Sequence, residues 1–503
     1  MTAYGGNEPN AMAAEVDANT PADSNVLRVT ITDAALLALE NNKSLLVQRF
    51  NTEIQQTFEQ ERLSAFDPNF AASIAKSRRR AESIPRPGLG SFPALSEDVL
   101  GNVGISQFFP TGTSLSLDGS TDILSGSFLD QPFATTRIGG TVTQSLLRGV
   151  GTAVNLASVN QARIDTKATE YELRGFTESL VAQTEETYWD YMLAQYRIKI
   201  FTQSLELARK QLDETKERIK VGALAKSEQA AAEAEVALQR EFLINANSTL
   251  AKTKLNLLRL VNPPGCDLWD RDVILTSRPE RPAEPNDTVG PHVALAMQMR
   301  PDLNQAKLQW QRDDLEVVKT KNGLLPKLDL FLTLGKTGYA DSFGRSVDNI
   351  FHDNNYDILG GVAFGLSPMN RGEKARNLRA VVSRNQAREA INNLAQLVEV
   401  DVRTAYIEIM RTQEQVAATA ATRKLQEEKF NVEAEKFRVG KSTSLLVAQT
   451  QRDLLVSQIA EIEVIASYIK SFVELYRLEG SLLERRGIVS PGREAVKLKE
   501  FDH

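Results

Sequence analysis

The chain contains very little cysteine and histidine. Cys266 is the single cysteine among 503 residues, so an intrachain disulfide is impossible and a zinc or iron–sulfur site built on several thiolates is excluded. The three histidines stand far apart, at His292, His352 and His503, without the spacing of metal ligands. They also offer no Ser–His–acid or Cys–His set for nucleophilic catalysis. The sequence therefore predicts no enzyme, no metal site and no cofactor.

Long apolar runs are missing as well. No stretch of the chain approaches the roughly 18 consecutive apolar residues that a membrane-spanning helix needs. Such a chain can cross a membrane only through strands that close into a barrel, because lipid cannot satisfy open backbone groups. The amino terminus also lacks a charged segment followed by an apolar one, the pattern of a secretory signal. We therefore expect a mature chain, a start that lies upstream, or a cytosolic protein.

The charge balance excludes one class of partner. The formal net charge is -6, so no overall basic field attracts nucleic acid, and we predict no nucleic-acid partner. One basic cluster, Arg78–Arg80, stands out, and we interpret it as a solvent-exposed loop rather than a phosphate site.

The second half of the chain repeats the first half. The pairs that match are Tyr188 with Tyr406, Val221-Gly222 with Val439-Gly440 and Arg259-Leu260 with Arg477-Leu478, all 218 positions apart, and Leu45 with Leu303 and Pro68 with Pro326, both 258 positions apart. Constant spacing between long similar segments indicates internal duplication. Because each copy covers roughly half of the chain, we predict a duplicated domain rather than a solenoid of short repeats.

Each copy has the same order of elements. A helix ends at a proline, short alternating strands follow, and two long helices separated by a Val-Gly turn complete the copy. The predicted divisions are a disordered segment at 1–28, a first repeat at 29–275 with strands at about 68–147 and long helices at about 150–262, a proline-rich linker at 276–291, a second repeat at 292–486 with strands at about 327–367 and long helices at about 370–482, and a charged tail at 487–503.

Alternation and heptads locate the individual elements. The predicted strands are 70–77, 103–108, 113–117 and 138–146 in the first copy, and 328–334 and 358–367 in the second. From Leu455 to Tyr476, apolar residues recur at spacings that alternate between four and three. This heptad pattern is typical of coiled-coil packing.

These features together resemble TolC-like outer membrane efflux proteins, the outer membrane factors of tripartite efflux and type I secretion systems. The resemblance covers about residues 28–485 and rests on the duplication, the opening Ile31–Asn42, the helix-to-strand prolines, Gln144–Gly149, Thr187–Asp190 and the paired Val-Gly turns. It implies an α+β membrane protein with a long coiled-coil α-helical barrel and a shared transmembrane antiparallel β-barrel. Family members are homotrimers that usually contribute four strands per chain. The additional turn at Phe109–Gly112 raises the expected number here to four or more.

The resemblance also implies the function and the partners. We expect an export duct in the outer membrane, with its helical domain in the periplasm, that receives substrates from an inner-membrane pump. The expected partners are two further copies of the chain, a periplasmic adaptor protein, the pump and outer membrane lipid.

Family resemblance places a docking tip at the two Val-Gly turns. The residues carried over for adaptor docking are Val221, Gly222, Ala223, Leu224, Val439, Gly440, Lys441 and Ser442. Glycine at these turns permits the left-handed conformation that ends one helix before the next begins.

Resemblance further assigns the pore constriction and its closing contacts. The positions that form acidic rings in relatives are occupied here by Leu446 and Gln449. The positions of the family's closing contacts are occupied by Glu228, Phe437 and Ser442. Phe437 has no hydroxyl and Ser442 cannot form a bidentate ion pair, so the family's charge-assisted latch cannot be built in the same way. Leu446 is then either a packed coiled-coil position or part of an apolar ring that closes the tunnel by dewetting, with Gln449 behind it.

One other class of function fits the helices. A soluble structural coiled-coil protein that acts as an interaction scaffold would use the same heptads. The alternating strand blocks distinguish the two hypotheses, because a scaffold has no use for strands whereas a barrel requires them.

Overall fold

The computed structural model describes residues 26–82, 93–127, 129–265, 268–278 and 288–497. The predicted disordered segment up to residue 25, Cys266, the linker part 279–287 and the end of the charged tail, including His503, lie outside the described residues.

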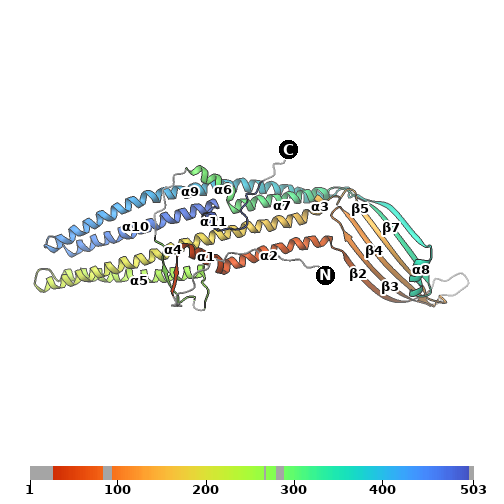
Figure 1. Ribbon diagram of the computed structural model, residues 1–503, viewed down its shortest axis with the longest axis horizontal. Helices are drawn as coiled ribbons and strands as arrows, with labels where there is room; N and C mark the ends of the chain where they lie inside the picture. Colours follow the sequence, from red (N-terminus) through yellow and green to blue (C-terminus); the bar gives the residue numbers. More distant parts are fainter. Residues whose placement is uncertain (1–25, 83–92, 128, 266–267, 279–287, 498–503) are drawn as a thin grey trace, which may run out of the picture. The chain divides into compact units, whose positions relative to one another are not determined.

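Long helices and one sheet make up most of the described chain (Figure 1). The helices are α1 (Ile31–Asn41), α2 (Lys43–Leu63), α3 (Thr152–Asn155), α4 (Ala157–Lys220), α5 (Ser227–Val261), α6 (Val289–Met299), α7 (Pro301–Gly323), α8 (Phe343–His352), α9 (Arg371–Arg438), α10 (Ser444–Glu479) and α11 (Leu482–Arg485), with a 3-10 turn η1 at Ser64–Phe66. None of the described helices is both long and apolar enough to cross a membrane.

The strands form two sheets. The six-stranded sheet has the order β2-β3-β4-β5-β7-β8, and all of its neighbouring strands are antiparallel. Its strands are β2 (Asn69–Glu82), β3 (Pro93–Phe108), β4 (Thr113–Gly126), β5 (Phe133–Ser145), β7 (Lys327–Ala340) and β8 (Tyr356–Gly365). Each of the six strand segments expected from sequence overlaps one of them, although 138–146 and 358–367 were expected to run one and two residues past the observed ends of β5 and β8. A separate parallel pair joins β1 (Val26–Val29) to β6 (Asp272–Leu275).

The chain folds into two compact units, each made of separate stretches. Unit 1 comprises Met1–Asn42, Gln183–Pro282 and Thr412–Lys470, and unit 2 comprises Lys43–Ala182, Ala283–Arg411 and Ser471–His503. Unit 1 contains the two helical turns, and unit 2 contains the six-stranded sheet.

The core of unit 1 forms where the small β1–β6 sheet meets the long helices. Tyr188 and Trp189 of α4 lie buried with Leu257 and Leu258 of α5 and with Val273 of β6. The two aromatic rings pack edge to face at 5.4 Å, a favoured geometry. The phenol of Tyr188 also donates to the Val29 carbonyl at 3.2 Å, so the helix and the small sheet are joined by a buried hydrogen bond.

Unit 2 contains a buried arginine. Arg174 of α4 is 0% exposed, and its guanidinium lies 3.2 Å from the Glu178 carboxylate and 2.6 Å from that of Glu484. It also donates to the carbonyl of Gly480 at 2.8 Å. Burial raises the pKa of Glu178 to about 8, against the opposing effect of Arg174. The arginine therefore holds two carboxylates and the C-terminal end of α10 together.

Replacing this arginine should destabilise the protein strongly. Arg174→Ala leaves the buried Glu178 and the partly buried Glu484 without their cation, which we expect to lower the free energy of unfolding by about 3–5 kcal/mol. Arg163, on the same helix, is half exposed and pairs with Glu59, so Arg163→Ala should cost less than about 1 kcal/mol. Urea unfolding followed by circular dichroism measures both variants. Equal losses would show that Arg174 does not organise this unit.

Three expectations from sequence differ from the structure. The first helix of each copy is broken, at Asn42 and at Arg300, which are 258 positions apart and therefore equivalent in the repeat. Pro301 disfavours the helical conformation of Arg300, and the Asn42 side chain donates to the Leu260 carbonyl at 3.0 Å. Arg78–Arg80 lie within β2 rather than in a loop, because their strand pairs with β3 along its whole length.

The third difference concerns the ends of predicted segments. Residues 26–28 belong to β1 rather than to a disordered segment, since β6 supplies a pairing strand. The linker was expected to run to Pro291, but α6 begins at Val289, and proline is tolerated in the first turn of a helix. In the charged tail, the Val496 amide donates to the Asn304 side chain at 3.0 Å, so this part of the tail lies against α7.

Candidate functional site at the two helical turns

The two Val-Gly turns have the same backbone geometry. After α4, the Ala223 amide donates to the Arg218 carbonyl at 2.8 Å and the Gly222 amide donates to the Ile219 carbonyl at 3.0 Å. After α9, the amides of Lys441 and Gly440 make the equivalent bonds at 2.8 and 3.0 Å, to Lys436 and Phe437. Each pair is a Schellman motif, which satisfies the last carbonyls of a helix.

Glycine is required at the centre of each motif. Gly222 has φ +77° and Gly440 has φ +80°, values that cost an L-residue about 1–2 kcal/mol. A Cβ at either position would meet no atom within 4 Å, so the constraint comes from the backbone and not from crowding. The preceding valines are strongly exposed, Val221 at 78% and Val439 at 65%. Ala223 and Lys441 are also exposed, while Leu224 and Ser442 are half-buried.

The two helical hairpins, α4–α5 and α9–α10, are linked by Arg218, which caps the C-terminal end of α9. Arg218, near the end of α4, donates to the carbonyls of Phe437 and Arg438 at 2.9 and 3.2 Å. Its guanidinium also lies 4.9 Å from the centre of the Phe437 ring. These carbonyls belong to the last turn of α9, where a positive charge is favoured. Phe437, carried over as a closing contact, is therefore buried beneath Arg218.

A carboxylate makes the complementary contact at the start of α10. Glu228, in the first turn of α5, accepts hydrogen bonds from the hydroxyl of Ser444 and from its amide, the latter at 3.3 Å. An anion is stabilising at a helix amino terminus. Glu228 and Phe437 therefore take part in two separate links between the hairpins. Ser442 donates instead to Glu433, and this bond, together with Lys436, lowers the pKa of the Glu433 carboxyl.

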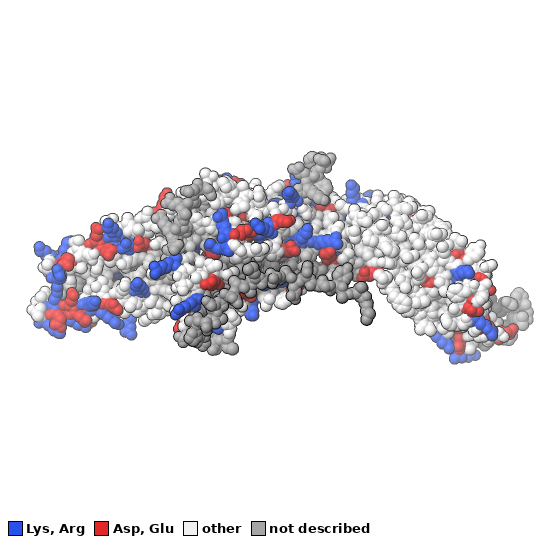
Figure 2. All heavy atoms as spheres, viewed as in Figure 1, with Lys and Arg blue, Asp and Glu red and all other residues white. Residues whose placement is uncertain are grey.

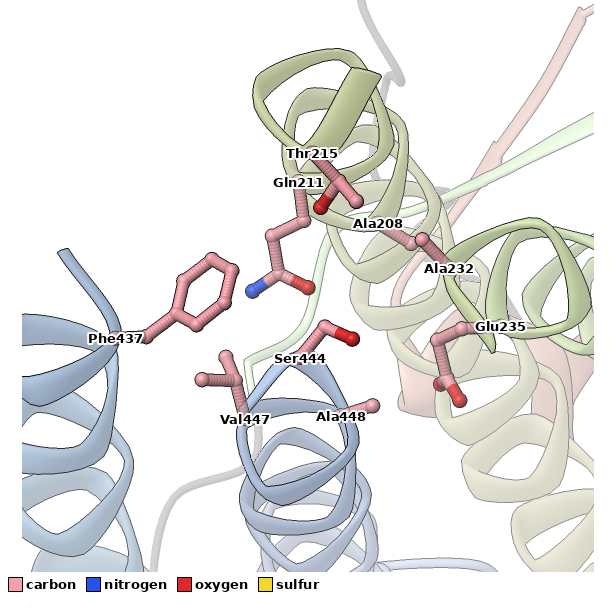
Figure 3. A pocket seen from close by; sticks show the side chains of 9 residues that line it. All are labelled: Ala208, Gln211, Thr215, Ala232, Glu235, Phe437, Ser444, Val447 and Ala448. Atoms are coloured by element: carbon pink, nitrogen blue, oxygen red, sulfur yellow. The ribbon is translucent and has the colours of Figure 1, made fainter. Parts of the chain in front are cut away.

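The space between the hairpins is small. Figure 3 shows side chains from α4, α5, α9 and α10 that point toward one another around it: Ala208, Gln211, Thr215, Ala232, Glu235, Phe437, Ser444, Val447 and Ala448. The volume is about 20 Å³, room for one water molecule. The buried Glu235 pairs with Arg452 at 3.3 Å. The hairpins are thus packed together, and this space is too small for an organic ligand.

Leu446 and Gln449 lie on the exposed side of α10. Leu446 is 45% exposed and Gln449 is exposed one turn later, whereas Val447 and Thr450 are buried. The packing within one chain therefore leaves the two predicted constriction residues uncovered. Figure 2 shows lysine, arginine, aspartate and glutamate interspersed around this end of unit 1.

Sequence reasoning missed Arg218 and Ser444. Arg218 lies in the segment that revealed the repeat, but its equivalent in the second copy is Lys436. Lysine is a point charge and lacks the fork with which Arg218 reaches two carbonyls. That difference between the copies was the available signal. Among the described residues, no cluster of His, Cys, Asp and Glu could hold a metal ion.

One protein-family model matches the second repeat of the chain. The family model described as outer membrane efflux protein matches residues 293–481. No curated protein sequence matches the chain.

Solved structures share the fold over almost the whole chain. The CmeC outer membrane channel of Campylobacter jejuni aligns with a TM-score of 0.68 at 15% identity, over 95% of this chain and 94% of that one. The outer membrane protein VceC of Vibrio cholerae aligns at 0.65 and 15% identity, over 90% and 96%. The open state of the MtrE outer membrane channel of Neisseria gonorrhoeae aligns at 0.64 and 15% identity, over 90% and 89%.

At these identities the structures establish the fold, while the family model establishes the sequence relationship for the second repeat. The expected resemblance to outer membrane efflux proteins is therefore confirmed by the family match over residues 293–481, and the fold of the chain is one shared with solved outer membrane channels.

Proposed function

We propose that the chain is the outer membrane duct of a tripartite efflux or type I secretion system. It passes substrates from an inner-membrane pump, through the periplasm, to the exterior. The observation that carries this proposal is the six-stranded sheet of unit 2, which exposes an apolar face and presents a polar face on its other side. A soluble scaffold protein has no need of such a sheet.

The apolar face extends across all six strands. The register places one set of exposed side chains on this face: Phe70, Ile74, Val103, Ile105, Leu117, Ile138, Val142, Leu330, Leu332, Leu334, Ile358, Val362 and Phe364. Charged side chains are sparse over the middle of the sheet surface visible in Figure 2. A continuous apolar surface of this extent indicates contact with a membrane or a protein partner.

The opposite face carries polar and charged side chains. Arg137 of β5 lies 3.1 Å from Asp118 of β4 and 2.7 Å from Asp357 of β8. A Cβ at Gly139 would come within 2.5 Å of the guanidinium, so the glycine makes room for this network. Farther along the same face, the hydroxyls of Thr141 and Thr333 lie 2.9 Å apart. A polar face of this kind fits a water-filled lumen.

The ends of the sheet support assembly from several copies. Within the described residues, β2 and β8 form the edges of the sheet. A sheet edge in lipid needs a partner strand, so we propose that three copies close one barrel and that their helices form the periplasmic tunnel. Six strands from each of three chains give a barrel of eighteen strands, a size that leaves an aqueous channel.

The helical turns are the proposed docking site for the periplasmic adaptor. Both turns expose a valine and a positive-φ glycine, and both belong to unit 1, where Arg218 and Glu228 fix the two hairpins to each other. A paired, rigid set of turns suits recognition by the hairpin of another protein. The proposed partners are thus two further copies, the adaptor, the pump and outer membrane lipid.

Reconstitution tests this function. Purified protein added to planar bilayers should produce discrete ion-conducting steps, and native mass spectrometry in detergent should show three chains per particle. The soluble-scaffold alternative predicts no conductance and no insertion. A stable single-chain species without conductance would contradict the duct.

The proposed constriction at Leu446 has its own test. If Leu446 forms an apolar ring that resists wetting, Leu446→Ser should raise single-channel conductance several-fold. Because the ring carries no acidic residue, we also expect weak cation selectivity and little block by divalent cations. Val456 is exposed three turns farther along α10, so Val456→Ser is the matched control. Unchanged conductance in Leu446→Ser, or strong divalent block of the wild type, would place the gate elsewhere.

A further inference from the structure

The short helix α8 packs against the sheet at the start of β5 and the end of β7. Helix α8 connects β7 to β8, and its Ser346 hydroxyl lies 2.7 Å from the Thr136 hydroxyl of β5. A Cβ at Gly338 of β7 would be 2.0 Å from the Ser346 carbonyl oxygen, so glycine is needed for this close approach. The helix is therefore held firmly on the sheet.

The register shows on which face α8 lies. Thr136 and Gly338 are direct partners, and both alternate in phase with the apolar residues Ile138, Val142 and Leu334. Helix α8 thus lies on the apolar face, beyond the last apolar side chains of β5 and β7. The Arg137 network lies on the opposite face.

Helix α8 has apolar side chains that the sheet does not cover. Ser346 and Ile350 are buried against the strands, while Phe343 is 52% exposed and Phe351 is 71% exposed. At 100° per residue, Phe343, Val347 and Phe351 lie along one side of the helix. Asp348 and His352 lie along another side and are both exposed. These two phenylalanines give the ten-residue helix an exposed apolar surface.

A third aromatic residue extends this surface. Tyr356, at the start of β8, is 72% exposed and pairs in register with Lys336, which in turn pairs with Ile138 on the apolar face. Aromatic residues beside an apolar band are typical of the boundary between hydrocarbon and lipid headgroups. An amphipathic helix with charges on one side and phenylalanines on another lies in the same boundary.

We infer that α8 is an interfacial helix that binds the lipid surface, with Phe343 and Phe351 in the outer hydrocarbon and Asp348 and His352 among the headgroups. The inference rests on the proposed function, because it takes the apolar face of the sheet to contact lipid. Lipid is the favoured occupant because α8 lies on the same face of the sheet as the exposed apolar side chains, with only Lys336 of β7 between Leu334 and Gly338 beneath the helix. The polar side also carries the exposed Arg345, so Asp348 and Arg345 supply charges of both signs, which suits a hydrated headgroup layer.

Site-directed spin labelling tests the inference. The single cysteine is first removed with Cys266→Ser, and one nitroxide is then attached in each of the variants Phe343→Cys, Phe351→Cys, Asp348→Cys and Ile358→Cys. The full chain is reconstituted in phosphatidylethanolamine–phosphatidylglycerol vesicles. Power saturation then compares collisions with oxygen, which concentrates in lipid, and with a water-soluble nickel chelate. Each variant must keep the helical content of the wild type.

The positions should rank in a fixed order. Ile358 pairs in register with Leu334, deeper in the apolar face than α8, and should favour oxygen most. Labels at 343 and 351 should favour oxygen over nickel several-fold, and the label at 348, on the same helix, should favour nickel. If 351 is as open to nickel as 348 while 358 remains in lipid, α8 is not interfacial, although the duct stands. Shielding of 343 and 351 from both reagents would mean that protein covers the helix, which also overturns the inference. Nickel access at 358 would overturn the proposed function and this inference together.

Discussion

Replacing Gly222 or Gly440 with glutamate is expected to abolish export while leaving the protein assembled in the membrane. Both glycines adopt positive φ, so any L-residue strains the turn by about 1–2 kcal/mol. No atom lies within 4 Å of the added Cβ, so the new side chain projects from the exposed turn without a steric clash. At the proposed adaptor contact, a bulky charge would block docking.

The measurement compares resistance to a toxic export substrate with the amount of assembled protein in the outer membrane. Gly487 supplies a matched control, because it also has positive φ with open space around its Cα but lies after α11 in unit 2. Gly487→Glu should therefore leave export intact. The variants Gly222→Ala and Gly440→Ala separate backbone strain from bulk. Full export by both glutamate variants would remove the turns from the docking site.

Placing a lysine on the apolar face should prevent membrane assembly. Leu332 lies near the middle of that face and pairs in register with Val142, which is also exposed. A lysine facing lipid at the bilayer midplane costs about 2–4 kcal/mol, and every chain of an assembly bears that cost. We therefore expect Leu332→Lys to reduce the assembled outer membrane form severely.

The neighbouring residue provides the control. Thr333 points to the polar face, where its hydroxyl contacts Thr141. Thr333→Lys adds the same charge one position away, and a water-filled lumen should tolerate it. Gradient fractionation followed by electrophoresis without boiling measures the assembled form of each variant. Equal assembly of the two variants, or a stronger defect in Thr333→Lys, would contradict the proposed orientation of the sheet.

The strands could be located from sequence because their alternation is strong near the helix-proximal ends. Val103 and Ile105 share one parity in β3, and Leu328, Leu330 and Leu332 share one parity in β7. The strand ends farther from the helices were harder to predict. Strand β3 was expected over 103–108 but extends over Pro93–Phe108. Residues 94–102 include serine, glutamate, aspartate, glycine and asparagine, which are rare in strands. Pairing with β2 and β4 overrides that local preference.

Other features depend on neighbours that are distant in sequence. Helix α8 contains glycine, serine, asparagine and aspartate, a composition typical of loops, and it is held by Thr136 from a separate strand. Arg174 resembles a surface residue in the sequence, and only its position among Glu178, Glu484 and Gly480 explains its burial. The Val-Gly turns were predictable because glycine marks a local backbone requirement. Their links through Arg218 and Glu228 were not, since they join separate hairpins.

Cell fractionation of the wild-type protein tests the proposed duct most directly. Membranes from cells that make the protein are separated by density, and each fraction is run in detergent before and after boiling. We predict that the protein lies in the outer membrane fraction and migrates at three times the 55.6 kDa mass of the chain until it is boiled. A single-chain species in the soluble fraction would contradict the duct and would favour the coiled-coil scaffold.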